Sequence, residues 1–566
     1  MTDLIVTATT VITMDEQRPR ADAVAVADGL IVAVGTLAEC TAALPGAEVV
    51  DTGAAALLPG FIEPHGHPLI SGIATQPPMY SIAPWNAPTW SDALALIQTA
   101  IAETDPSEPL LFSGFDALLH ERPAPDATEL DQIFGDRVAA ITDNSGHGVY
   151  FGTALMKLHG WDHTPPQDPV GGYYSRNADG TLDGRGFEVP TILEALGPLI
   201  ARLGDPVYPG ALFFAVMSRA GYTSASDMSY DPASKPAYER LAAAASCPLR
   251  ISLWEMSTTE TFTEPDEFVA DDDMLRKAGV KAWTDGAVWV GSGATSFPYI
   301  DSEATRRAGI DPATAGGTGS LNYTRDQLAP IMDAAIQGGW QMAFHSNGDL
   351  GVEVALDVYE SALQRHDLLG TDHRWRIEHA GGATRPQLDR AARLGVHVSL
   401  SPFQYYFWGD LLNGQIFDEE HGHRWQPFAD SVASGVCVSL HNDGSVSPPS
   451  PLGNIQTVVS RRTRTGNIHG ADQAIPLDAA LRAQTIDAAR TLRREHLVGS
   501  IEVGKLADFV ELSADPYDVE PAELLESVHV NGTWLAGQRI DLDAFLQAVQ
   551  RNGATNEPIA PISRCC

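Results

Sequence analysis

Two histidines with the spacing of metal ligands stand directly after an apolar segment near the start of the chain. His65 and His67 follow the run 57–62 and are separated by one glycine. Residues two apart on a strand point to the same side, so both imidazoles can reach one cation. The pair alone carries little weight, because its spacing also occurs by chance.

Further candidate ligands end other apolar segments of the chain. Each follows a short run that reads as a buried strand, and their separations fit strand–helix units. If these strands lie in one parallel sheet, their carboxyl ends meet at the same edge and bring the side chains together. These candidate ligands are His345, His379 and Asp443.

A second histidine pair with the same spacing offers a comparison. His421 and His423 follow the acidic segment 418–420 rather than an apolar run. We interpret this second pair as solvated surface. Both pairs have the same spacing, so the position of His65 and His67 after an apolar run is what indicates a metal site.

One lysine stands inside an apolar strand. Lys281 lies in the run 279–284 of a chain that has only five lysines. Burying an ammonium ion is costly, and a desolvated lysine loses its proton readily. Its free amine can add carbon dioxide to form a carbamate, an anionic group able to bridge two metals. The alternative is a side chain that reaches out of the strand to solvent.

Eight apolar runs predict the strands that position these residues. Helical stretches separate many of them, such as the one that begins at the capping box Thr324–Gln327 and stops at Gly338. This alternation predicts an α/β fold, a (β/α)8 TIM barrel with its site at the carboxyl ends of the strands. The predicted strands are 57–62, 222–228, 249–254, 280–283, 342–344, 375–377, 397–400 and 436–440.

Both ends of the chain carry β-rich segments with hairpin signals. Asp28-Gly29 and Asn531-Gly532 each lie between apolar runs, which predicts a small β-sandwich domain built from both termini. The long gap after barrel strand 1 predicts an insertion, with a helix over 91–104. The expected units are 1–57 for the first part of the β-sandwich, 58–72 for barrel strand 1, 73–215 for the insertion domain, 216–495 for the rest of the barrel, and 496–566 for the second part of the β-sandwich and the C-terminal tail.

These segments together resemble the amidohydrolase superfamily, most closely its YtcJ-like branch (amidohydrolase family 3), which includes N-substituted formamide deformylases. The opening 58–67 is similar to that branch's PGFIDxHxH, with Glu63 in place of Asp, and Asn442 stands where Ser usually precedes the Asp. The motif DxHxxxxNxxAL is matched loosely: His147 fits, but Gly152 replaces Asn. Residues 280–286, 345–349, 376–380 and 499–508 resemble VKxxxDG, HAIGD, RIEHA and GSIExGKxAD.

The resemblance implies a binuclear site holding two Zn²⁺ ions per chain. Another divalent metal is an alternative, and a single ion is expected if the lysine is not carboxylated. By position, His65, His67 and Asp443 would bind one metal, His345 and His379 the other, and carboxylated Lys281 would bridge them. Asp443 would also be catalytic, taking the proton from the attacking hydroxide and passing it to the leaving nitrogen.

The implied activity is hydrolysis of an amide-type C–N bond, other than a peptide bond, by metal-activated hydroxide. N-substituted formamides and other aromatic or apolar amides are candidate substrates. Hydrolysis of a lactone, ester or carbamate is the alternative reaction, because the same attack serves all of them. A catalytically inactive binding protein is the alternative outside the enzymes, although all six ligand positions are filled.

Aromatic residues near the strand ends indicate substrate contacts. The segment 402–408 predicts an aromatic loop after strand 7, and packing is the alternative interpretation. A histidine in the insertion would donate to the substrate or serve a structural role. The candidate substrate-binding residues are His147, Trp283, Phe403, Tyr405 and Tyr406.

The composition excludes several classes of partner. With Lys+Arg 36 against Asp+Glu 73, the net charge of −37 argues against nucleic acid and anionic membranes. Five cysteines without a CxxC motif give no disulfide framework, and Cys565-Cys566 is interpreted as a frayed tail. Without a leader-like or membrane-spanning run, we expect a cytoplasmic enzyme acting on a small molecule. A homodimer is expected from the resemblance alone.

Overall fold

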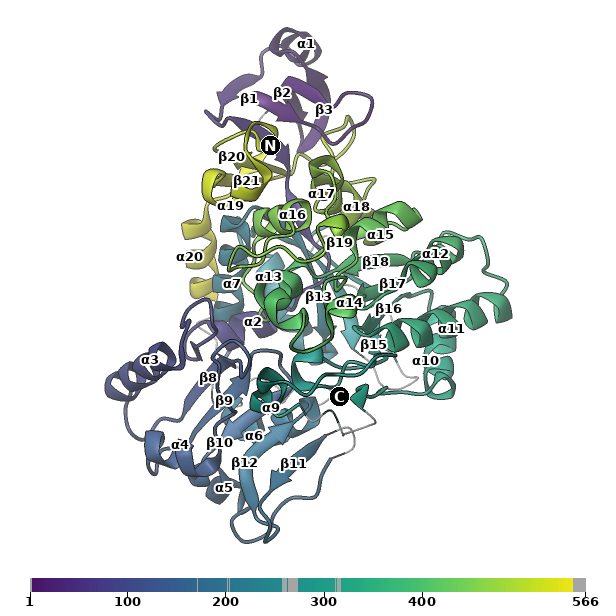
Figure 1. The fold of residues 1–566 in the computed structure, drawn as a ribbon. Coiled ribbons are helices and arrows are strands. Elements are labelled where there is room, and N and C mark those ends of the chain that lie inside the picture. The colour runs from purple at the N-terminus through teal and green to yellow at the C-terminus, as the bar shows by residue number, and fades with distance from the viewer. Residues whose placement is uncertain are drawn as a thin grey trace.

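Figure 1 shows three sheets that follow one another along the molecule. The sheet made by both chain ends lies at the top of the view, the barrel in the middle, and the sheet that follows barrel strand 1 at the bottom. The computed structural model describes residues 3–169, 172–200, 202, 204–256, 262, 273–310, 312 and 317–552. The predicted tail Cys565-Cys566 lies outside the described residues.

The central sheet has eight parallel strands in chain order, so the predicted parallel barrel is confirmed. Seven of the predicted apolar runs overlap seven of these strands, whereas the first predicted run, 57–62, covers β5 (Ala56–Pro59) of the terminal sheet and only the start of β6. The strands are buried along most of their length, polar residues included, because parallel strands are covered on both faces. The strands are β6 (Phe61–Glu63), β13 (Tyr222–Tyr230), β14 (Arg250–Met256), β15 (Leu275–Trp283), β16 (Gln341–Ser346), β17 (Arg376–His379), β18 (His397–Leu400) and β19 (Val438–Leu440).

One glutamine joins the two outer strands of this sheet, where ladder pairing stops. The Gln484 amide donates to the backbone oxygens of Ile62 at 2.7 Å and Leu440 at 3.3 Å. Its own backbone oxygen accepts from Ile62 N at 3.0 Å. A buried side chain thus bridges β6 and β19 across the seam of the barrel.

Helices cover the outside of the barrel. The predicted capping box at Thr324 and Gln327 is present, and the helix it begins ends at Gly338. No helix in the described part of the chain is long and apolar enough to cross a membrane. The larger helices around the barrel are α7 (Val207–Arg219), α8 (Lys235–Ala242), α10 (Arg325–Gln337), α11 (Asp349–Arg365), α12 (Arg385–Leu394), α13 (Pro402–Leu412), α15 (Phe428–Ser434), α16 (Pro451–Ser460), α17 (Leu477–Ala483) and α18 (Ile486–Thr491).

Strands from both chain ends form one hydrogen-bonded sheet, in the order β22-β21-β20-β5-β1-β2-β3 with β4 beside β1. The closing of a terminal sheet by both ends is therefore observed, whereas its folding into a sandwich stays a prediction. The helix α20 (Leu542–Asn552) follows this sheet. The strands are β1 (Leu4–Ile12), β2 (Arg20–Ala27), β3 (Leu30–Gly35), β4 (Glu48–Asp51), β5 (Ala56–Pro59), β20 (Phe509–Leu512), β21 (Val530–Leu535) and β22 (Gln538–Arg539).

Of the two predicted hairpin turns, one is confirmed and one is wrong. Asp28 and Gly29 have φ values of 51° and 81°, as a turn between β2 and β3 requires. Asn531-Gly532 instead lies within β21, and the turn falls at Ala536-Gly537.

A second sheet interrupts the barrel after strand 1, in the order β11-β12-β10-β9-β8-β7. The helix predicted over 91–104 is present as α3 (Trp90–Glu103). The expected limits at 73 and 215 fall inside α2 (Pro68–Thr75) and α7, and the domain limits stay a prediction. The other elements are β7 (Tyr80–Ser81), β8 (Leu110–Phe115), α4 (Ala127–Phe134), β9 (Ala139–Asp143), β10 (Gly148–Phe151), α5 (Thr153–His159), β11 (Tyr173–Arg176), β12 (Leu182–Phe187) and α6 (Val189–Ile200).

The hydrogen bonds that Gln484 makes between β6 and β19 lead to a prediction about stability. Replacing Gln484 by Leu leaves buried carbonyl oxygens of both strands without their donor, so we expect the free energy of unfolding to fall by about 2–4 kcal/mol. Denaturant unfolding monitored by circular dichroism measures this. Gln98→Leu, on the exposed face of α3, is the control and should stay within about 0.5 kcal/mol. Equal stability of the two variants would show that the bridge does not matter.

Candidate metal centre

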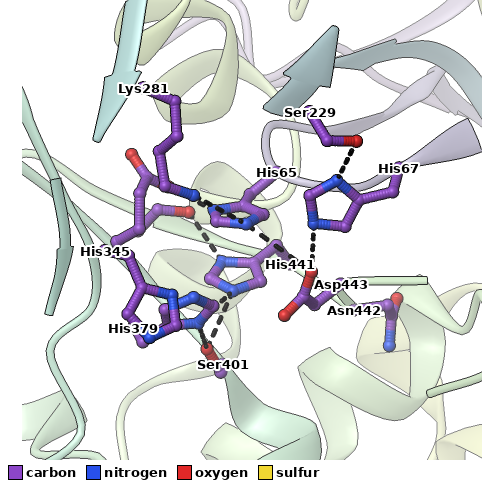
Figure 2. Close-up of polar contacts among 12 residues, drawn as sticks. His65, His67, Ser229, Lys281, His345, His379, Ser401, His441, Asn442 and Asp443 are labelled. Carbon is purple, nitrogen blue, oxygen red and sulfur yellow. Dashed lines mark hydrogen bonds and ion pairs between the residues drawn. The ribbon is translucent and has the colours of Figure 1, made fainter. Parts of the chain in front are cut away.

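The structure gathers all six predicted metal ligands around one cavity of about 310 Å³ (Figure 2). They come from the carboxyl ends of five barrel strands. Two stand in the loop after β6, one each in β15, β16 and β17, and one follows β19. These residues are His65, His67, Lys281, His345, His379 and Asp443.

His65 is oriented by a carboxylate on its outer side. Its Nδ1 lies 2.7 Å from Oε2 of Glu378. An ionised carboxylate only accepts, so Nδ1 carries the hydrogen and Nε2 keeps a lone pair. That Nε2 faces the centre, 3.4 Å from Lys281 Nζ and 3.5 Å from Asp443 Oδ1. This is the outer-partner pattern of a metal-ligating histidine.

His67 repeats the arrangement with a serine. Its Nδ1 lies 2.9 Å from the Ser229 hydroxyl, and its Nε2 lies 3.1 Å from Asp443 Oδ1. That oxygen is buried, yet no described group makes a hydrogen bond to it. Burial raises the pKa of Asp443, but His67 and Lys281 outweigh burial and hold it below its ordinary value. An ionised, unsatisfied oxygen between two imidazoles suits a cation.

His345 and His379 form the other side of the centre, with ring centroids 4.5 Å apart. Nδ1 of His379 lies 2.9 Å from Ser401 Oγ, and Nε2 of His345 lies 3.4 Å from the backbone oxygen of Gly286. One nitrogen of each ring is thus held by the protein. His379 has a φ of 71°, a strained backbone of the kind found at functional sites.

Lys281 is 2% exposed and lies in the centre of the site. Burial lowers its pKa to about 8, despite the opposing charges of Glu378 and Asp443. A lysine in this state readily presents the free amine that carbon dioxide requires. The side chain therefore does not reach out of its strand to solvent.

The side chains fit one or more metal ions. Burial lowers the pKa of His65, His345 and His379 well below the ordinary value, so their rings are neutral, the form that binds metals. The described residues contain two sets of three side chains, and within each set the ligand atoms all lie within 4.8 Å of one another. The sets are His65, His67 and Asp443, and His65, His379 and His441.

His441 was missed by the sequence reasoning, although it also ends an apolar strand, two residues before Asp443. Its Nδ1 and Nε2 each lie 2.8 Å from a serine hydroxyl, of Ser399 and Ser401 respectively. Both ring nitrogens are therefore engaged. Because Ser401 also contacts His379, we interpret His441 as the support of that ligand.

The second histidine pair lies apart from the metal cavity and stays partly exposed, although it also packs against the protein. The ring of His421 stacks on Phe297 with centroids 3.9 Å apart, and its Nδ1 lies 2.7 Å from Asp418. His421 and His423 are both partly buried. The acidic segment caps a short helix rather than extending into solvent.

Of the predicted substrate contacts, Trp283 and His147 line the cavity. The expected aromatic loop is wrong: residues 402–412 form helix α13. Tyr405 is buried, and its hydroxyl donates to the backbone oxygens of Arg461 and His469. Phe403, Tyr405 and Tyr406 are not among the described residues that line the cavity.

The cavity has an apolar wall that sequence reasoning also missed. It comes from α2 and α6, and α6 lies in the insertion, whose position over the barrel no sequence pattern reveals. Lys281 is the single lysine or arginine among the described lining residues. The apolar wall residues are Ile70, Ile73, Met79, Ile192, Leu196 and Ile200.

The carboxyl of Glu63, two residues before His65, is buried. Burial raises the pKa of Glu63 to about 8, so it is protonated at neutral pH. Its Oε1 accepts from the backbone N of Asn442 at 2.9 Å, which joins β6 to the segment carrying Asp443. Glu63 thus holds the two ends of the site together in place of the Asp that resembling sequences have.

A barrel of this kind with imidazole, lysine and carboxylate side chains at its carboxyl edge defines a hydrolase-type metal centre, and comparison with known proteins agrees. The sequence model of the Amidohydrolase family matches residues 48–541. The chain therefore belongs to this family.

Curated relatives confirm the resemblance to the YtcJ-like branch. The N-substituted formamide deformylase of Arthrobacter pascens is 28% identical, over 93% of this chain and 96% of that protein. The putative amidohydrolase YtcJ of Bacillus subtilis (strain 168) is 25% identical, over 93% and 97%. An uncharacterized metal-dependent hydrolase from Pyrococcus horikoshii OT3 shares the fold, with a TM-score of 0.69, 22% identity and coverage of 92% and 99%.

Whether His441 is a metal ligand or the support of a ligand can be tested against His345. His345→Ala removes a ring with a nitrogen available to a metal, whereas His441→Asn removes an outer support, which typically lowers metal affinity about 10–100-fold. We expect the first variant to lose zinc affinity more severely in a competitive chelator titration. If His441→Asn lost as much, His441 would be a ligand.

Proposed function

We propose that this protein is a metal-dependent hydrolase that cleaves an amide-type C–N bond in a small apolar substrate. The observation that carries this proposal is the single cavity shared by six ligand-type side chains and an apolar wall. Membership of the amidohydrolase family and the similarity to an N-substituted formamide deformylase support it. An N-substituted formamide is therefore the first substrate class to test.

Different residues of the chain would bind the metal ions and accept the proton. His65, His67 and Asp443 would hold one Zn²⁺ ion, and His345 and His379 a second. A bound divalent metal supplies Lewis acidity, which polarises a carbonyl and lowers the pKa of water. Asp443, ionised and facing the cavity, would accept the proton that the attacking water loses.

Lys281 would join the two halves of the ligand set as a carbamate. The buried amine attacks carbon dioxide, the new N–C bond leaves a carboxylate, and one proton is released to solvent. Its Nζ lies 3.4 Å from His65 Nε2, so the added carboxylate would stand among the imidazoles. The neutral rings around it favour an anionic partner for the cations.

The residues that line the cavity favour apolar substrates without a carboxylate. Its wall of isoleucine, leucine and methionine gains from burying an alkyl or aryl group. Apart from Lys281, no lysine or arginine among the described lining residues could pair with a substrate anion. Ester, lactone or carbamate hydrolysis is the second candidate, because the same apolar wall and carboxylate base serve those bonds.

The first test combines metal content with a variant of the base. We expect about two zinc ions per chain, by plasma mass spectrometry on protein purified without chelator. Asp443→Asn should keep metal but lose about 10²–10⁴-fold in turnover of N-substituted formamides. Unchanged turnover in this variant would contradict the proposed role, and no metal after reconstitution with zinc and bicarbonate would contradict the hydrolase.

The carbamate has its own test. Lys281→Ala removes the bridge, so turnover and metal content should collapse, and short carboxylic acids added to the assay should restore part of both. Such rescue distinguishes a missing carboxylate from general damage. Metal content and turnover close to those of the unmodified protein would reduce Lys281 to a structural residue.

A further inference from the structure

The insertion places one histidine in the wall of the metal cavity. His147 lies just before β10, lines the cavity, and has a side chain that is 14% exposed. Its Nδ1 lies 2.8 Å from Oε2 of Glu188, and its backbone oxygen accepts from Glu188 N at the same distance. Two contacts thus fix the ring against one carboxylate.

Glu188 adopts a backbone conformation that its side chain does not favour. Its φ is 71°, in the left-handed region that non-glycine residues rarely adopt. Pairing of Gly148 with Phe187 in the neighbouring strands brings Glu188 directly beside His147. Strained residues that are held by their surroundings cluster at functional sites, which makes this pair a candidate for one.

Two hydrogen bonds fix the insertion on the barrel close to the metal ligands. Asn144 Nδ2 donates to the backbone oxygen of Val446, at 3.1 Å, three residues after Asp443. The Trp408 indole in α13 donates to Asp116 Oδ2, also at 3.1 Å. The position of the histidine relative to the barrel site is therefore set by the fold and not by a free loop.

One nitrogen of the His147 ring is available to a substrate. Nδ1 faces the carboxylate, whereas Nε2 makes no hydrogen bond to any described residue. The charged and titratable groups that act on the ring are Glu188 after β12, Asp143 in β9, Asp443 after β19 and His345 in β16. Burial lowers the pKa of His147, but the three carboxylates outweigh burial and raise it above its ordinary value.

From this geometry we infer that His147 is a second catalytic residue that protonates the leaving nitrogen through Nε2, and that Glu188 is its positioning residue. The inference rests on the proposed hydrolysis and adds to it. Asp443 faces the cavity from the barrel and His147 faces it from the insertion. Acid and base are then separate side chains on separate parts of the fold, instead of one aspartate serving both steps.

The proton transfers balance. The attacking water gives its oxygen to the acyl carbon and one proton to Asp443. The C–N bond breaks, its electron pair stays on nitrogen, and the nitrogen takes the proton from Nε2 of His147. Asp443 then releases its proton to solvent while His147 regains one, so that one water is consumed and a carboxylic acid and an amine leave.

The test compares two leaving groups. The amine of N-benzylformamide needs a proton to leave, whereas the phenolate of 4-nitrophenyl acetate does not. We expect His147→Asn to lower kcat for the amide by about 10²–10⁴-fold and kcat for the ester only slightly. A structural defect would lower both alike. Circular dichroism and zinc content should match those of the unmodified protein.

A matched control uses another pair at the same distance. His366, directly after α11, has its Nε2 2.8 Å from Oδ1 of Asp333 in α10. His366→Asn should leave the turnover of both substrates unaffected. Glu188→Gln removes a carboxylate that raises the pKa of His147, so the acid form should be lost at lower pH. The alkaline limb of the amide pH–rate profile should therefore move toward lower pH.

Failure of the inference differs from failure of the proposed function. If the unmodified, zinc-loaded protein hydrolyses the amide and His147→Asn slows amide and ester equally, His147 is not the acid. An unmoved alkaline limb in Glu188→Gln would likewise overturn the positioning role. If the unmodified protein hydrolyses neither substrate, the proposed hydrolysis itself is wrong, and the inference falls with it.

Discussion

A buried ion pair inside the barrel is the constraint on which the site depends. Arg376 and Glu378 are both 0% exposed, and two of their atoms lie 2.8 Å apart. Taking two charges out of water costs several kcal/mol each, so such a pair persists only when further contacts complete it. Here Glu378 also holds the His65 ring, and Arg376 donates to the backbone oxygen of Pro64. The pair in the core thus fixes the first metal ligand and the chain beside it.

The same logic extends to the other ligands. The imidazoles of His65, His345 and His379 are neutral because burial lowers their pKa, and serine hydroxyls support two of the ligand rings from outside. Ser229 serves His67, and Ser401 serves His379. Ligands held from behind in this way stay in position without a metal, so little conformational freedom is lost when a cation binds. The parallel barrel suits this task because all its strands end at one edge.

The sequence predicted what depends on local pattern and missed what depends on long-range packing. Short apolar runs marked the barrel strands, and the ligands followed as residues at their ends. The first run, 57–62, merged β5 of the terminal sheet with β6, because no local pattern separates two consecutive strands that belong to different sheets. The Asn531-Gly532 signal failed because pairing with β20 overrode a local turn preference. The stacking of His421 on Phe297 was not visible, because the two rings are distant in sequence. The sequence places His441 at a strand end, but only its contacts with two serines distinguish a residue that supports a ligand from a metal ligand.

The insertion explains why the barrel alone is an incomplete site. The barrel edge supplies imidazoles and carboxylates that suit cations, and α2 beside it supplies only Ile70 and Ile73 of the apolar wall. Helix α6 of the insertion supplies Ile192, Leu196 and Ile200, and the segments beside β10 and β12 bring a histidine and its carboxylate to the same cavity. Because the Trp408 indole and Asn144 fasten the two parts, a change in the insertion can alter substrate preference while the ligand set stays intact. Selectivity and metal binding are therefore built on separate sheets of one chain.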